Sequence, residues 1–144
     1  MKQTLLALSL VVVLGSCKSA KQVNTTNIKD TNKMETTTKL SNKDKVVALL
    51  NSFNTGDQTP ISYINPNKYI QHNLAVGDGL AGFGEVMHHA PEGGFKANVV
   101  RAFEDGDYVF THTEYDFFGP KAGFDVFRFE DGVIVEHWDN LLEI

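Results

Sequence analysis

Apolar residues return every three or four positions between residues 41 and 56, which is the spacing of one buried helix face. The stripe at positions i, i+3, i+4 and i+7 consists of Val46, Leu49, Leu50 and Phe53. Ser41 is a helix-capping residue type with Asp44 three positions later, and Gly56 suits the left-handed position that ends a helix. The pattern therefore predicts an amphipathic helix that starts after Ser41 and ends at Gly56.

Further along the chain the apolar pattern changes its period. Pro60 and Pro66 suit first helical positions, so short helical turns are predicted at 60–65 and 66–72, and a third helix is predicted at 79–90. After residue 95, runs of Val, Phe, Tyr and Ile predict strands at 95–103, 107–118, 123–130 and 133–143. Helices followed by an antiparallel meander predict an α+β fold.

The turns between the strands predict a register. Two Phe-Glu-Asp-Gly segments, 103–106 and 129–132, are interpreted as three-residue hairpin loops, and 119–122 as a four-residue loop. This register pairs Asp125 with His137 and brings His112 near Phe129, whereas a one-residue slip would place Asp125 opposite Trp138. Because side chains alternate between faces, one face is predicted to hold Phe110, His112, Glu114, Asp125, Phe127, Phe129, Val133, Val135, His137 and Asp139. The other face is predicted to include Tyr115, Phe117, Phe124 and Trp138.

The first predicted face combines an apolar wall with two histidines and three carboxylates. A few titratable groups that converge on an apolar wall are typical of a small-molecule pocket. Asp125 opposite His137 is a candidate acid/base pair that could work near neutral pH. The alternative interpretation is that these polar residues form the rim of a half-solvated sheet.

Composition and charge divide the chain into two parts. Residues 18–40 carry five Lys against Asp30 and Glu35, whereas residues 41–144 carry seven Lys or Arg against sixteen Asp or Glu. All 15 aromatic residues lie at or after Phe53. An acidic domain of this kind is not expected to bind nucleic acid. Residues 17–40 lack the apolar content to fold and are predicted to be a flexible tether, although a basic partner-binding arm is an alternative.

The first seventeen residues resemble a bacterial lipoprotein signal. A positive start is followed by an apolar run from Leu5 to Leu14, and Gly15-Ser16 precedes Cys17, which is the single cysteine of the chain. The resemblance implies a signal peptide at 1–16, lipidation of Cys17, and a location in the bacterial cell envelope, with the outer membrane favoured because Lys18 follows. The alternative is an ordinary secretory signal that happens to contain a cysteine.

The domain at 41–144 resembles the SnoaL-like polyketide cyclase family of the nuclear transport factor 2-like superfamily. The matching segments are YIQHN at 69–73, DGDYVF at 105–110, His112, FDVFRFEDG at 124–132 and IVEHWD at 134–139. This resemblance implies a cone-shaped, curved antiparallel sheet wrapped by helices, a deep apolar cavity and a homodimer. The second predicted face would suit the dimer contact.

The resemblance also implies roles for particular residues. By position in the motif, Asp125 would be the general acid/base and His112 would assist it, without a metal or other cofactor. The residues expected to contact a ligand are Tyr69, His72, Phe127, Phe129, His137 and Asp139. A metal at the His112-x-Glu114 and His137-x-Asp139 pairs is disfavoured, because the predicted strands hold the two pairs about 10 Å apart.

Two functions follow from the sequence. The first is a cofactor-free cyclase or isomerase acting on a small apolar carbonyl compound, with Asp125 as the proton carrier and His112 polarising the substrate oxygen. The second is an anchored module that binds an apolar ligand without chemistry, or a dimeric adaptor. An open cavity reached by Asp125 would favour the first, and a cavity filled by Phe side chains would favour the second.

Overall fold

The first helix forms where its capping residues and apolar stripe predict it. The computed structural model describes residues 39–144, and α1 runs from Asn42–Thr55. Ser41 Oγ accepts a hydrogen bond from the Asp44 N–H, and Gly56 ends the helix with φ 72°. The predicted signal peptide (1–16), Cys17 and all but the last two residues of the predicted tether (17–40) lie outside the described residues.

The segment between α1 and the sheet contains three short elements. Pro60 lies in the 3-10 helix η1 (Thr59–Tyr63), as the first predicted turn requires. The second predicted helical turn, 66–72, is wrong, because none of these residues is helical and Ile70–Gln71 form the two-residue strand β1. Helix α2 (Gly79–His88) follows and ends two residues before the predicted boundary.

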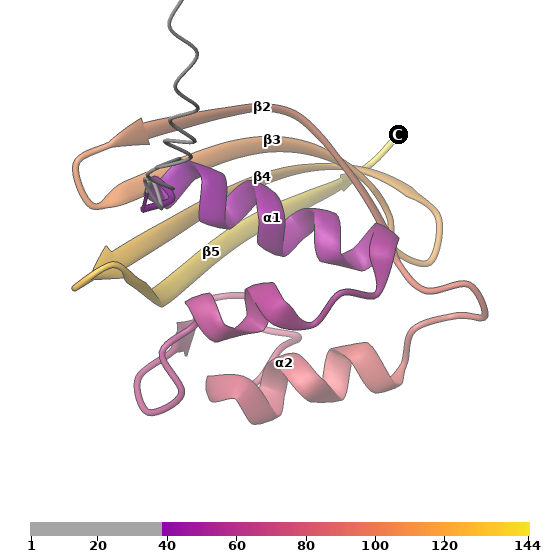
Figure 1. The fold of residues 1–144 in the computed structure, drawn as a ribbon. Coiled ribbons are helices and arrows are strands. Elements are labelled where there is room, and N and C mark those ends of the chain that lie inside the picture. Colours follow the sequence, from indigo (N-terminus) through magenta and orange to yellow (C-terminus); the bar gives the residue numbers. More distant parts are fainter. Residues whose placement is uncertain (1–38) are drawn as a thin grey trace, which may run out of the picture. The chain divides into compact units, whose positions relative to one another are not determined.

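The sheet contains the four predicted strands and β1. The long strands are β2 (Lys96–Asp105), β3 (Tyr108–Asp116), β4 (Pro120–Glu130) and β5 (Val133–Glu143). They pair antiparallel in the order β5-β4-β3-β2, and β1 adds to the free edge of β5 in the parallel sense. Figure 1 shows the long strands curving past α1, which packs against β2 and β3. The predicted α+β architecture with a curved sheet is confirmed.

The predicted register between β3 and β4 is wrong. The connecting loop is Phe117–Gly119, with φ 55° at Phe118 and φ 112° at Gly119, and Asp116 pairs with Pro120. His112 therefore pairs with Phe124, and Thr111 is the residue opposite Asp125. Because the shift from the predicted register is an odd number of residues, it turns His112 to the sheet face opposite to that of Asp125.

The register between β4 and β5 also differs from the prediction, but the predicted residues still lie on the same face of the sheet. The hairpin loop has two residues, Asp131 and Gly132, and a bulge interrupts the pairing between Arg128 and Phe129. Together these changes place Asp125 opposite Asp139 and Phe127 opposite His137. The net shift of two residues keeps His137 and Asp139 on the same face as Asp125.

The two faces of the sheet have different surroundings. The inner face packs against α1 in a core that includes Val46, Leu49, Val109, Phe129 and Ile134. The outer face carries exposed aromatic side chains, among them Phe103, Phe110 and Phe124. Tyr115 is buried in the core and Phe117 packs against it, which contradicts their predicted place on a dimer-contact face. Within residues 39–144, no helix has the length and apolar character needed to cross a membrane.

Candidate functional site

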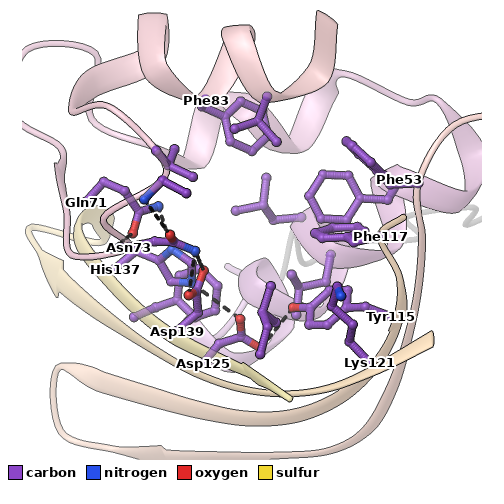
Figure 2. A pocket seen from close by; sticks show the side chains of 18 of the residues that line it. Phe53, Gln71, Asn73, Phe83, Tyr115, Phe117, Lys121, Asp125, His137 and Asp139 are labelled. Atoms are coloured by element: carbon purple, nitrogen blue, oxygen red, sulfur yellow. Dashed lines mark hydrogen bonds and ion pairs between the residues drawn. The ribbon is translucent and has the colours of Figure 1, made fainter. Parts of the chain in front are cut away.

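An apolar cavity of about 540 Å³ lies between the inner face of the sheet and the helices. Figure 2 shows its polar residues Gln71, Asn73, His137 and Asp139 gathered on one side, with Phe53, Phe83 and Phe117 across the hollow. The side chains that line it are Leu49, Leu50, Phe53, Tyr69, Gln71, Asn73, Ala75, Val76, Phe83, Val86, His89, Phe95, Tyr115, Phe117, Phe118, Lys121, Asp125, Phe127, His137, Asp139 and Leu141. The lining provides a large apolar contact surface and a few polar groups at one end, which is the composition of a small-molecule site.

Asp125 lies on the cavity floor and is only 3% exposed. Its Oδ2 accepts hydrogen bonds from Thr111 Oγ1 at 2.7 Å and from the Tyr115 hydroxyl at 2.9 Å. Thr113 Oγ1 in turn donates to Thr111 Oγ1 at 3.2 Å. A buried carboxylate requires such donors, and because both act on Oδ2, Oδ1 remains directed toward His137.

Close packing of β3 on β4 brings the Tyr115 hydroxyl to Asp125. A Cβ atom on Gly123 would lie 2.3 Å from the Tyr115 ring, so the ring can cross β4 only because residue 123 has no side chain. Burial, the Asp125 charge and the hydrogen bond to Asp125 all raise the pKa of Tyr115 well above its usual value. Tyr115 therefore remains a protonated hydrogen-bond donor at physiological pH.

His137 is the nearest imidazole to Asp125. Its Nε2 lies 3.4 Å from Asp125 Oδ1, and its Nδ1 lies 2.9 Å from Gln71 Nε2. Among the buried side-chain nitrogen and oxygen atoms of the described residues, His137 Nε2 is the one without a hydrogen-bond partner. A buried polar atom without a hydrogen-bond partner is rare in folded proteins, and it marks His137 as a candidate functional residue.

Asp139 forms the second acidic group of the site. Its two carboxylate oxygens accept from Asn73 Nδ2 at 2.8 and 3.0 Å. Asn73 belongs to the connection after β1, and its own Oδ1 accepts from the Ala75 N–H at 2.9 Å. The connection between β1 and α2 thus holds Asp139 in place.

The structure brings together some of the predicted site residues and separates others. Asp125, Tyr69, Phe127, His137 and Asp139 all line the cavity. Three predicted residues do not line it: His112, His72 and Phe129. The predicted assistance of Asp125 by His112 required the two side chains to share a face, and the structure places His112 on the opposite one. The predicted neighbour of Asp125, His137, does lie beside it.

Each of the three displaced residues has other contacts. His112 stacks on Phe124 on the outer face, with ring centroids 5.0 Å apart. His72 stacks on Trp138 at 4.5 Å and its Nε2 lies 2.7 Å from Glu136 Oε1. Phe129 is buried in the core, with Lys45 Nζ 5.9 Å from its ring centroid. The odd register shift moved His112, and Phe129 lies too near the hairpin end of the sheet to reach the cavity.

Several residues of the site were missed at the level of sequence. The predicted register places His112 on the inner face, whereas Thr111 is the residue that lies there opposite Asp125. Gln71 and Asn73 occur in the YIQHN segment that carried the family resemblance, yet nothing in their local sequence indicated a role. A correct β3–β4 loop length would have identified Thr111, whereas Gln71 and Asn73 reach the site through the parallel β1–β5 pairing.

The acidic cluster also has the donor types of a cation site. Asp125, His137 and Asp139 each offer a ligand atom, and these atoms lie within 4.8 Å of one another. Lys121 lines the far side of the cavity near Tyr115 (Figure 2) and lies 3.3 Å from Glu143 Oε1. The site can therefore donate a hydrogen bond, accept a proton or hold a positive charge at one end of an apolar hollow.

Comparisons with known proteins show the fold. A nuclear transport factor 2-like protein of unknown function from Cytophaga hutchinsonii matches with a TM-score of 0.62 at 18% identity, over 74% of this chain and 94% of that one. A protein with a cystatin-like fold from Xanthomonas campestris gives a TM-score of 0.59 at 24% identity, over 72% and 92% of the two chains. IdmH from Streptomyces antibioticus, described as a candidate polyketide cyclase, gives 0.55 at 22% identity, over 71% and 92%.

These similarities define a class of fold. The domain has the α+β fold of nuclear transport factor 2-like and cystatin-like proteins, as the sequence resemblance implied. No protein-family model matches the sequence, and no curated protein matches it. What the cavity does must therefore be argued from its own residues.

Proposed function

We propose that the domain binds a small apolar carbonyl compound in the cavity and transfers a proton on it without a cofactor, as a cyclase or isomerase does. The observation that carries this proposal is the position of Asp125, which is 3% exposed at the floor of the cavity with Oδ1 3.4 Å from His137 Nε2. A carboxylate within reach of the substrate can act as a general base. The apolar lining would hold the body of the substrate over it.

The proposed reaction divides the work between two side chains. Asp125 takes a proton from the carbon next to the substrate carbonyl: the C–H bond breaks, a carboxyl O–H bond forms, and the electron pair moves onto the carbonyl oxygen. His137 Nε2–H donates a hydrogen bond to that oxygen and stabilises its developing charge. The enolate carbon then attacks a second carbonyl of the same molecule, whose oxygen takes the proton back from Asp125. In the isomerase case the enolate is conjugated with a C=C bond, and Asp125 returns the proton to a different carbon.

The hydroxyl groups behind Asp125 fit this cycle. Thr111 and Tyr115 both donate to Oδ2, so they hold the carboxylate while Oδ1 faces the substrate. Because Oδ2 can still accept when Oδ1 carries a proton, Asp125 can be protonated on Oδ1 without losing these contacts. His137 replaces His112 as the residue proposed to polarise the substrate oxygen.

The alternative of binding without chemistry receives less support. The aromatic side chains line the cavity but leave about 540 Å³ of it open. A binding module would need only the apolar wall, whereas a buried carboxylate beside an unpartnered imidazole nitrogen adds desolvation cost with no benefit to apolar binding. The candidate cyclase IdmH has the same fold, which is consistent with the first function.

The experiment that tests the proposal starts from the ligand. The full chain is purified, its co-purifying small molecules are identified by mass spectrometry, and each carbonyl compound found is incubated with the protein in D₂O. Deuterium incorporation next to the carbonyl is expected, and Asp125→Asn should lower its rate by about 10²- to 10⁴-fold. Asp105→Asn, at an exposed position at the end of β2, is the matched control. Exchange at an unchanged rate in Asp125→Asn would remove Asp125 from the mechanism.

We also propose that the domain is anchored in the cell envelope through lipid on Cys17, which rests on the sequence alone. Labelling cells with a clickable fatty acid should mark the wild-type protein and leave Cys17→Ser unmarked.

The proposed homodimer would use the outer face, where Phe103 pairs with Phe110 across β2 and β3 and Phe124 is exposed. Sedimentation of the Cys17→Ser chain should show a dimer that Phe110→Glu dissociates, and a monomer before that substitution would refute it.

A further inference from the structure

Gln71 reaches the site through an unusual connection. Strand β1 is two residues long and pairs in parallel with β5, so that Ile70 lies opposite Glu136 and Gln71 opposite His137. The pairing continues into the next residue, whose N–H donates to the His137 carbonyl oxygen at 2.9 Å. The Gln71 side chain thus lies beside the His137 imidazole, with Gln71 Nε2 2.9 Å from His137 Nδ1 (Figure 2).

The hydrogen bonds of Gln71 determine which way its amide group faces. The Asn73 backbone N–H, which can only donate, lies 3.0 Å from Gln71 Oε1. The oxygen of the amide must therefore face Asn73, which leaves the NH₂ group facing His137. An NH₂ group only donates, so His137 Nδ1 must accept, and a neutral imidazole that accepts at Nδ1 carries its proton on Nε2.

We propose that Gln71 is a positioning residue that fixes His137 as the neutral tautomer with its proton on Nε2. The Nε2–H group then points to Asp125 Oδ1 and the cavity, where it meets no hydrogen-bond partner in the described part of the chain. This inference rests on the proposed function in one respect: it makes His137 the donor that the substrate oxygen requires. The tautomer itself is a property of the protein without substrate and can be measured alone.

The same arrangement has a consequence for the ligand that the site accepts. A metal ion held by Asp125, His137 and Asp139 would need the lone pair of His137 Nε2, and the proton would have to move to Nδ1. Gln71 would then have to turn its amide over to accept that proton, and its NH₂ group would face the Asn73 N–H. Gln71 therefore favours a ligand with an uncharged oxygen acceptor over a divalent cation at this position.

The test reads the tautomer directly. Two-bond ¹H–¹⁵N spectra of ¹⁵N-histidine-labelled full chain distinguish protonated from unprotonated ring nitrogens, and His137→Gln assigns the signal among the five histidines. The wild type is expected to show the proton on Nε2 of His137. Gln71→Glu presents an acceptor at the same place and should move a proton onto Nδ1, while Gln58→Glu, on an exposed residue before η1, should change nothing.

Two further measurements keep the inference testable if Gln71→Glu fails to fold. Gln71→Met keeps the size of the side chain but removes the amide, and it should leave His137 with both tautomers. Zn²⁺ or Mg²⁺ added to the wild type should leave the His137 signals unchanged. A proton on Nδ1 in the wild type, a retained Nε2–H in Gln71→Glu, or Zn²⁺-dependent shifts of Nε2 would each overturn the proposal.

Measurements of turnover test the proposed function separately from the tautomer of His137. Once a substrate is found, Gln71→Glu should lower kcat by about 10²- to 10⁴-fold, because a wrongly placed proton cannot stabilise the enolate oxygen. KM should change much less, because the apolar wall is intact. A wild type with the proton on Nε2 but with no exchange on any bound carbonyl compound would refute the function and leave the tautomer assignment standing.

Discussion

Asp125 and His137 are diagonal neighbours on strands β4 and β5, with Asp125 Oδ1 3.4 Å from His137 Nε2. Asp125 lies directly opposite Asp139, and His137 lies opposite Phe127, two residues along the same face. Diagonal pairs on one face remain within reach of long side chains. The contact places a hydrogen-bond donor next to a carboxylate at the floor of an apolar cavity, and it is the geometry from which the proposed chemistry follows.

Substitution of His137 and substitution of His112 should have different effects. His137→Ala removes the nitrogen nearest Asp125 and should lower α-carbon exchange on a bound carbonyl compound by about 10²-fold or more. His112→Ala removes a side chain on the opposite face that stacks on Phe124, and it should leave exchange within a factor of about two. Exchange rates in D₂O, compared at equal folded concentration, check both. Equal losses in the two variants would contradict the assignment of the inner face.

Tyr115 should link stability to pH in the alkaline range. Its pKa is raised by burial first and then by Asp125, so the folded protein keeps this proton at a pH where the unfolded chain loses it. The stabilisation is complete below the usual tyrosine pKa near 10 and is lost as the pH rises above it. Urea unfolding of the wild type should therefore show a free energy of unfolding that falls above about pH 10.

Tyr115→Phe should reduce that alkaline decline, and the part that remains is expected from Tyr69, whose pKa burial also raises. At pH 7 the substitution should also cost about 1.5–3 kcal/mol, because the hydroxyl of Tyr115 donates to a buried carboxylate. Tyr108→Phe, which removes a partly exposed hydroxyl, serves as the control and should do neither. Parallel curves for the wild type and Tyr115→Phe between pH 8 and 11 would show that the linkage lies elsewhere.

Glu136 should link stability to pH in the acidic range, where the free energy of unfolding should decrease as the pH falls. The hydrogen bond from His72, followed by that from Arg128, holds the pKa of Glu136 below its usual value. Near the usual glutamate pKa of about 4.3 the unfolded chain binds more protons than the folded one, so stability is complete above this pH and is lost as the pH falls through the lower folded-state pKa. Glu136→Gln should reduce this acid loss in urea titrations, whereas Glu92→Gln, on an exposed residue, should not. An unchanged acid limb in Glu136→Gln would count against the pairing.

The two interior glycines of α2 should respond in opposite directions to alanine. A Cβ on Gly82 would lie 1.8 Å from the Gly77 carbonyl oxygen, so Gly82→Ala must push the loop off the helix and should destabilise the domain by about 1–3 kcal/mol. A Cβ on Gly84 meets nothing within 4 Å, so Gly84→Ala should stabilise the helix by up to about 1 kcal/mol.

Urea unfolding measures both glycine variants, and ligand capture measures a second effect. Because Val76 and Phe83 line the cavity on either side of this contact, Gly82→Ala should also weaken ligand binding. Destabilisation by both substitutions to the same extent would show that the helix tolerates no side chain on either face, and the close approach to Gly77 would not be the cause.

Most elements of this domain could be predicted from local pattern, but strand β1 and the register of the long strands could not. The spacing of Leu49 and Leu50 within a capped stripe predicts α1 because the helical period is a local property. The β3–β4 loop could not be located in this way, because Phe118, which adopts φ 55°, lies in a run of apolar residues that also has the pattern of a strand. The Gly119-Pro120 pair is a turn signal that places the predicted loop at 119–122, whereas Pro120 is the first residue of β4 and β3 already ends at Asp116.

The sequence by itself determined the fold class, the alternation of each strand, and the presence of Asp125, His137 and Asp139 on one face, because an even shift in register preserves the face. Only the tertiary structure decided that Thr111 and Tyr115 support Asp125, that His112 faces outward, and that Gln71 and Asn73 orient His137 and Asp139. The physical reason is distance along the chain. The period of a strand is set by adjacent residues, whereas the β1–β5 contacts join residues 66 positions apart and depend on how the whole chain packs.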